Sequence, residues 1–175
     1  DQLPYSSMHV VAYGVDVRNP AIVYCATGEE KLLKASTNGV RKALERIVQP
    51  TGGPSSNGEF LSPKGSVNET EYCNFTTFHD TYAWMAITSG EAHWGDEMER
   101  VVFNGAQGAR KKDERAIAYF TAPNQLRANR ESCIYGDWSE YGVYAPNYFV
   151  ACCPTMSVRI VPEFVRSMAM TDENN

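Results

Sequence analysis

The sequence predicts a mainly α-helical protein with a small β element. Three stretches with apolar residues at helical spacing support this prediction, and they run from about Glu29 to Val48, 73 to 88 and 96 to 103. The aromatic-rich, alternating stretch from Ala116 to Ala122 is typical of a short strand. With 175 residues, 43% of them hydrophobic, the chain is long enough to bury a substantial core as one domain.

Capping and breaking residues set the expected bounds of the first helices. The mostly apolar stretch 9–26 predicts a helix that is kinked at Asn19-Pro20, or a second helix with Pro20 in its first turn. Thr27 and Glu30 have the spacing of a capping box for the helix that follows. Pro50 and the glycines after it end that helix.

The later part of the chain alternates between loops and helices. Residues 51–68 are rich in Gly, Pro, Ser and Asn and predict a long loop, the kind that more often carries function than not. Gly90 ends the predicted helix 73–88, and the predicted helix from residue 96 stops near Asn104-Gly105. Residues 123–150 predict mostly loop. A final helix runs to about Met168, with Pro154 at its first position and a kink at Pro162.

Charge and hydropathy exclude two classes of partner. The net charge is −5, and the densest basic run, residues 110–112, is followed at once by two acidic residues, so we expect no nucleic-acid site. No apolar stretch approaches the ~18–20 residues of a membrane span. The chain begins at Asp1 without Met, which suggests a mature product or a piece of a longer protein. Cytoplasmic and exported locations both stay open.

Five cysteines at irregular spacing favour metal or catalytic use over a disulfide scaffold. Glu71 and Cys73 lie two residues apart at a loop-to-helix junction, and Cys152-Cys153 open another helix. One oxygen and three sulfur ligands would satisfy tetrahedral zinc. The alternative is that these cysteines are small buried apolar residues, which is also our interpretation of Cys25 and Cys133.

Other polar residues allow both ordinary and catalytic interpretations. Glu59, in the glycine-rich loop, is either a solvated carboxylate or a proton donor in a cleft. We interpret His9, at an apolar helix start, as a hydrogen-bonded core histidine, and we assign no role to His79 or His93. A thiol-protease pair of Cys152 with His79 has no support in the local sequence.

Several motifs together resemble glycoside hydrolase family 127, the β-L-arabinofuranosidase family. They are His9-Val10-Val11, Ala26-Thr27-Gly28-Glu29, Thr51-Gly52-Gly53, Gly58-Glu59-Phe60, Glu69-Thr70-Glu71-Tyr72-Cys73, Gly95-Asp96-Glu97-Met98-Glu99-Arg100-Val101-Val102-Phe103-Asn104-Gly105, Ala118-Tyr119-Phe120 with Pro123-Asn124-Gln125, and Cys152-Cys153-Pro154. Single pieces are weak evidence, but six in the same order, with the paired Glu-x-Cys and Cys-Cys, are specific. Tyr72 stands where a small residue is common in the family, which points to a divergent subgroup.

The resemblance implies a fold and a domain organisation. The fold would be part of an (α/α)6 barrel of the six-hairpin glycosidase type, with a small β element. Residues 1–175 would be the second half of the catalytic domain, without the first half of the barrel or the C-terminal β-sandwich modules. Apolar faces left open by a half barrel would permit self-association.

The resemblance also implies a zinc-dependent retaining hydrolase that acts on terminal L-arabinofuranosyl or related sugars of plant-type glycans. Zinc would be held by Glu71, Cys73, Cys152 and Cys153. Cys152 would be the nucleophile and Glu59 the general acid/base. His9 and Tyr119 would lie near the sugar pocket. Two rival functions are a non-catalytic, zinc-stabilised helical module and a carbohydrate-binding remnant without turnover.

Overall fold

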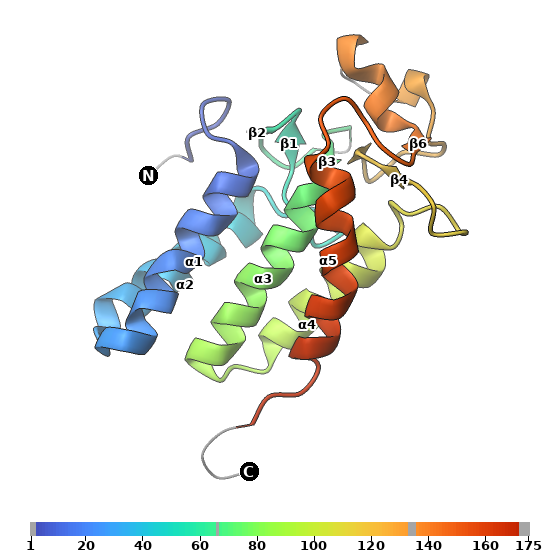
Figure 1. The fold of residues 1–175 in the computed structure, drawn as a ribbon. Helices are drawn as coiled ribbons and strands as arrows, with labels where there is room; N and C mark the ends of the chain where they lie inside the picture. Colours follow the sequence, from blue (N-terminus) through green and yellow to red (C-terminus); the bar gives the residue numbers. More distant parts are fainter. Residues whose placement is uncertain (1–2, 66, 133–135, 172–175) are drawn as a thin grey trace.

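The computed structural model describes residues 3–65, 67–132 and 136–171, and within them the chain is mainly helical, as predicted (Figure 1). The α-helices are α1 (Val10–Thr27), α2 (Glu30–Arg46), α3 (Tyr72–Ser89), α4 (His93–Glu99) and α5 (Cys152–Ser167). The helix α4 continues into a π-helical segment, η1 (Arg100–Ala106), and two 3-10 segments follow, η2 (Arg130–Ser132) and η3 (Gly136–Gly142).

In the described part of the chain, six two-residue strands form three small antiparallel pairs. They are β1 (Ser56–Asn57) with β2 (Phe60–Leu61), β3 (Thr70–Glu71) with β5 (Phe120–Thr121), and β4 (Ile117–Ala118) with β6 (Tyr144–Ala145). Glu71 lies opposite Phe120 in the second pair. This pairing joins the start of α3 to a segment almost fifty residues later in the chain.

The helices α1, α3 and α5 run in the same direction, and their first residues lie at the end of the molecule that carries the strands (Figure 1). The helix α3 lies between the other two and contacts both, whereas α2 packs back on α1 as a hairpin. Helix N-termini expose unbonded amide groups and the positive end of the helix dipole. The strand end of the molecule therefore favours anionic side chains.

The core is built around α3, which is buried along most of its length because helices cover it on both sides. Its large buried side chains are Tyr72, Phe75, Phe78, Tyr82 and Met85. By contrast, α2 is strongly amphipathic and buries one face, with Val40 and Ala43.

The Thr-Gly-Gly motif of the loop after α2 has a packing role. Gly52 has φ = 84°, and a Cβ there would lie 2.6 Å from the backbone nitrogen of Val101. Only glycine tolerates this conformation and this close approach of two backbones. The motif thus lets the loop lie directly on η1.

The structure decides between the two alternatives for the first helix and corrects the expected cap of the second. One continuous helix, α1, passes through Pro20, so no second helix begins there. The amide of Ala21 donates to the hydroxyl of Ser36 on α2 at 2.9 Å, a bond that fastens this helix to its neighbour just after the proline. The capping box does not form, because Thr27 is the last residue of α1 and the N-cap of α2 is Glu29.

Other bounds differ from the prediction by a few residues. The loop 51–68 contains the β1–β2 hairpin, and the strand expected over 116–122 is two short strands interrupted at Tyr119. The fourth helix continues through Gly105, where the missing Cβ leaves room for the Phe75 ring. The last helix begins at Cys152, which puts Pro154 at its third position.

Cys25 is exposed on α1, so its interpretation as a buried apolar residue was wrong. Cys133 lies outside the described residues. Within the described residues, every helix is too short or too polar to cross a membrane.

Candidate active site

Three helix N-termini surround one group of polar side chains. His9 is the N-cap of α1, Glu71 is the N-cap of α3, and Cys152 is the first residue of α5. The backbone places two further residues beside them. The amide of Val10 donates to the Glu59 carbonyl at 2.9 Å, and the amide that begins α3 donates to the Tyr119 carbonyl at 2.8 Å.

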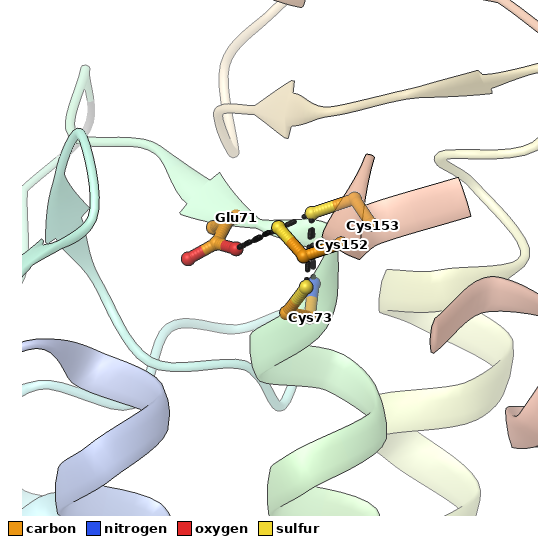
Figure 2. Close-up of side chains that lie close together, drawn as sticks. All are labelled: Glu71, Cys73, Cys152 and Cys153. Carbon is orange, nitrogen blue, oxygen red and sulfur yellow. Dashed lines mark hydrogen bonds between the residues drawn. The ribbon is translucent and has the colours of Figure 1, made fainter. Parts of the chain in front are cut away.

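Four side chains at this end form the Glu-Cys cluster, defined as Glu71, Cys73, Cys152 and Cys153 (Figure 2). Their ligand atoms all lie within 4.8 Å of one another. The Cys153 sulfur lies 3.2 Å from the Cys73 sulfur and 3.3 Å from Glu71 Oε1. The Cys152 sulfur lies 3.7 Å from the same carboxylate oxygen.

The donor set fits a tetrahedral zinc ion. Zinc with ligand bonds of ~2.0–2.3 Å holds its ligands roughly 3.5–3.8 Å apart, close to the separations in the Glu-Cys cluster. Glu71 is fully buried, and its Oε2 atom has no hydrogen-bond partner among the described residues. Burial raises the pKa of Glu71 to about 7. A buried carboxylate of this kind is stabilised by a cation.

The three thiols differ in exposure and acidity. Cys73 and Cys153 are buried, whereas Cys152 is exposed. Hydrogen bonds from Cys153 and Cys73 lower the pKa of Cys152 far below its usual range. Burial raises the pKa of Cys153, and the hydrogen bond to Cys152 raises the pKa of Cys73. These directions favour Cys152 over the two buried cysteines as the residue that carries a thiolate.

Tyr119 connects the Glu-Cys cluster to Glu59. Its hydroxyl lies 2.9 Å from Glu59 Oε1 and 2.9 Å from the Cys152 sulfur. Burial raises the pKa of Tyr119, so the phenol keeps its proton. These two contacts limit the separation of the Glu59 oxygen and the Cys152 sulfur to about 6 Å, near the ~5–5.5 Å between the two catalytic groups of retaining glycosidases.

His9 faces the other oxygen of Glu59. Its Nδ1 accepts a hydrogen bond from the Val11 amide at 3.1 Å, so the proton of the neutral ring is on Nε2. Nε2 lies 3.5 Å from Glu59 Oε2. The hydrogen bond between the two side chains lowers the pKa of Glu59 and raises that of His9. His9 is half-buried at a helix start, so its interpretation as a core histidine was wrong.

The structure thus brings together all seven residues that the sequence singled out. Cys152 has no hydrogen bond to a histidine among the described residues, and His79 is fully buried. Sequence reasoning missed Tyr148 and Tyr141. The Tyr148 hydroxyl lies 3.2 Å from the Tyr119 amide, and the Tyr141 ring packs against the Tyr119 ring at a centroid distance of 4.8 Å. Their signal was the tyrosine-rich stretch 141–148.

Solved structures share this fold. Ara127N, a GH127 β-L-arabinofuranosidase from Geobacillus stearothermophilus T6, matches with a TM-score of 0.69 and 17% identity over 93% of this chain and 26% of its own. BT3674, a GH127 β-arabinofuranosidase, matches with a TM-score of 0.59 and 20% identity over 89% of this chain and 23% of its own. No curated protein matches the chain.

The chain therefore spans about a quarter of the length of these two structures. Its helical hairpins agree with part of an α/α barrel, which confirms the predicted fold class. The model of the GH127 β-L-arabinofuranosidase catalytic domain matches residues 6–166, nearly the whole sequence, and the chain belongs to that family.

Proposed function

We propose that this chain provides the reaction centre of a retaining glycoside hydrolase that releases L-arabinofuranose or a related sugar from plant-type glycans. The observation that carries the proposal is the contact of one tyrosine hydroxyl with both Cys152 and Glu59. The contact holds the Cys152 sulfur within about 6 Å of a Glu59 oxygen, which supports attack on one side of a glycosidic bond and proton transfer on the other. The family match supports the glycoside hydrolase class.

Zinc fits the Glu-Cys cluster and, when bound, would keep the Cys152 sulfur ionised while making it a better leaving group. Glu71, Cys73 and Cys153 would hold it from the buried side, and Cys152 from the side that faces solvent. The buried residues also fix the position of Cys152, because Cys153 is its neighbour in the first turn of α5.

The first step forms a bond between the Cys152 sulfur and the anomeric carbon, while the bond from that carbon to the leaving-group oxygen breaks. Glu59, in its carboxylic form, gives its proton to the departing oxygen. His9 stabilises the carboxylate that remains, because its Nε2–H faces Glu59 Oε2. The products of this step are a thioglycosyl intermediate and the shortened glycan.

The second step returns the site to its first state. Glu59 accepts a proton from water, the water oxygen bonds to the anomeric carbon, and the sulfur–carbon bond breaks with its electron pair on Cys152. Two displacements at the same carbon retain its configuration. The exposed Cys152 leaves room for water, whereas the other three members of the cluster are closed to solvent.

Tyr119 has one hydroxyl proton and two acceptors, so it can donate to only one of them at a time. We propose that it donates to Cys152 while that sulfur is a thiolate and Glu59 holds a proton. Once the sulfur is bonded to the sugar, the hydroxyl turns to the Glu59 carboxylate. Tyr119 would thereby couple the state of the nucleophile to the state of the acid/base, next to the sugar that His9 contacts.

Activity of two variants tests this proposal, with an aryl β-L-arabinofuranoside as substrate. Cys152→Ser and Glu59→Gln should each abolish most turnover of a substrate with a poor leaving group. Glu59→Gln should lose far less activity on a dinitrophenyl glycoside, because that leaving group departs without a proton. Full activity of both variants on both substrates would refute the hydrolase.

Bound zinc distinguishes the hydrolase from a purely structural metal module. The chain should contain one zinc ion, which Cys73→Ala should lose and Glu59→Gln should keep. If Glu59→Gln is inactive yet folded and zinc-loaded, the role of Glu59 is chemical. If Cys73→Ala stays zinc-loaded, the ligand assignment is wrong.

A further inference from the structure

A second polar cluster lies on the same two helices, farther from their first residues. His79 and Asp80 belong to α3, and Glu163 belongs to α5. Each offers one ligand atom, and these atoms all lie within 4.8 Å of one another. Along α3, His79 is six residues beyond Cys73, or roughly 9 Å of helix, so this cluster is separate from the Glu-Cys cluster.

His79 is the unusual member of this cluster. The side chain is fully buried, and neither ring nitrogen has a hydrogen-bond partner among the residues that the structure describes. Its Nδ1 lies 3.9 Å from Asp80 Oδ1, beyond hydrogen-bond distance. Leaving a buried polar group without a hydrogen bond lowers the stability of the fold by about 1–3 kcal/mol. A buried imidazole with two such nitrogens therefore indicates a bound ligand.

Arginines hold only one side of each carboxylate. Asp80 Oδ2 lies 3.4 Å from guanidinium nitrogens of both Arg18 and Arg159. Glu163 Oε1 accepts from Arg159 at 2.8 Å, whereas Glu163 Oε2 is buried without a partner in the described chain. The arginines thus orient the two carboxylates and leave Oδ1 and Oε2 as the remaining donors, as partners of metal-binding carboxylates do.

A cavity lies beside Asp80 on the same two helices. The cavity has a volume of about 300 Å³ and is lined by Asp80 and Trp84 of α3 and by Ser167 of α5. Ser167 lies one helical turn after Glu163. The carboxylates are only slightly exposed, with 13% of each side chain reaching solvent. The cavity therefore borders one of the three candidate ligands, and an ion bound at these slightly exposed carboxylates would lose most of its water.

We infer that His79, Asp80 and Glu163 bind one divalent cation. One imidazole nitrogen and two carboxylate oxygens suit ions such as Mn²⁺ or Zn²⁺ that accept nitrogen and oxygen ligands. The three residues offer only nitrogen and oxygen ligands, whereas the Glu-Cys cluster offers thiolates, which favour zinc. The bound ion would satisfy the buried imidazole and would join α3 to α5 below the candidate active site.

Manganese is the probe that distinguishes the two sites, because it binds thiolates weakly. Protein first loaded with one equivalent of zinc should bind one Mn²⁺ per chain, measured by the loss of the free-ion signal in electron paramagnetic resonance. Pulsed spectra of the bound ion should show coupling to an imidazole ¹⁴N. Cys73→Ala should retain this Mn²⁺, which makes the test independent of the proposed function.

Variants assign the ligands. Asp80→Asn and Glu163→Gln should each weaken Mn²⁺ binding at least about tenfold, whereas Glu97→Gln, an ion-paired glutamate on α4, should not. His79→Leu should abolish the ¹⁴N coupling and should be at least as stable as the parent in chelator, because it removes two unsatisfied nitrogens. Mn²⁺ should raise the thermal midpoint of the parent but not of His79→Leu.

Three results would overturn the inference. The first is no Mn²⁺ bound at millimolar concentration. The second is unchanged binding and coupling in His79→Leu. The third is destabilisation of metal-free His79→Leu, which would mean that the imidazole serves packing instead.

Discussion

The hydroxyl group of Tyr119 contacts two of the candidate catalytic residues. Tyr119 interrupts the two strands on either side of it, is fully buried, and contacts both Cys152 and Glu59. Its hydroxyl is held in place because Tyr148 anchors the Tyr119 amide and Tyr141 packs on the ring. Nothing in the local sequence singles out this role, since an aromatic residue in a strand is usually core.

We expect Tyr119→Phe to lower kcat about 10- to 100-fold while the zinc content stays unchanged, since a charge-stabilising hydrogen bond is lost at both steps. Single-turnover kinetics on the aryl arabinofuranoside should show both glycosylation and hydrolysis slowed. Tyr144→Phe is the matched control, because its exposed hydroxyl donates to the Gly108 carbonyl away from the Glu-Cys cluster. A Tyr119→Phe protein as fast as its control would remove Tyr119 from the mechanism.

At the scale of elements, the site depends on helices that begin at the same place. The first residues of α1, α3 and α5 lie at the end of the molecule that carries β3 (Figure 1), and Glu71 in β3 pairs there with Phe120 of β5. The helix dipoles favour the thiolate of Cys152 there. The end of α3 was predictable from the sequence. Gly90 closes this helix with φ = 68°, as expected of a C-cap glycine.

Close packing of η1 on α3 yields a prediction about stability. A Cβ at Gly105 would lie 2.6 Å from the Phe75 ring and 2.9 Å from the Thr51 carbonyl oxygen. Gly105→Ala should therefore lower the free energy of unfolding by about 1–3 kcal/mol, as measured by chemical denaturation.

Gly95→Ala on α4 is the control for this packing effect. A Cβ at Gly95 meets nothing within 4 Å, so the substitution should raise the free energy of unfolding by about 0.5–1 kcal/mol through helix propensity. Equal effects of the two alanines would contradict the packing explanation.

At the scale of the whole molecule, burial of tyrosine side chains lowers the free energy of unfolding at alkaline pH. Burial raises the pKa of Tyr13 to about 12, and its hydroxyl donates to the Gly39 carbonyl at 2.9 Å. In the unfolded chain the pKa is about 10. The stabilisation is therefore complete below pH 10 and is lost as pH rises from 10 to 12, by up to about 2.7 kcal/mol.

The free energy of unfolding, measured from pH 8 to 12, should fall above pH 10. Tyr13→Phe should show a shallower fall, while Tyr144→Phe, at an exposed position, should follow the parent. A Tyr13→Phe curve parallel to the parent would show that other groups cause the alkaline transition.

The outer face of α5 predicts self-association. Val158, Val161, Val165 and Met168 lie at helical spacing and are all more than half exposed. A continuous apolar stripe of this kind favours contact with another apolar surface. Sedimentation should show dimers or larger species at micromolar concentration, and Val161→Lys with Val165→Lys should favour the monomer. Val67→Lys, at an exposed loop position, should leave association unchanged.

The sequence by itself determined the helices and the chemistry of the cluster members. Helical periodicity, Gly90 and the order of Glu71, Cys73 and Cys152-Cys153 are local features, because helix formation depends on residues three and four apart. Local sequence left open whether α1 passes through Pro20, and it did not predict that the loop after α2 forms a hairpin. Those outcomes depend on partners such as Ser36 that are distant in the chain.

Only the tertiary structure decided which residues meet. Glu59, Tyr119 and Cys152 are separated by 60 and 33 positions, and they come together through one strand pair and through helices that start at the same end. The same packing brings Glu163 to His79 on the neighbouring helix. The physical reason is that contacts across a core depend on how whole elements pack, and no short stretch of sequence contains that information.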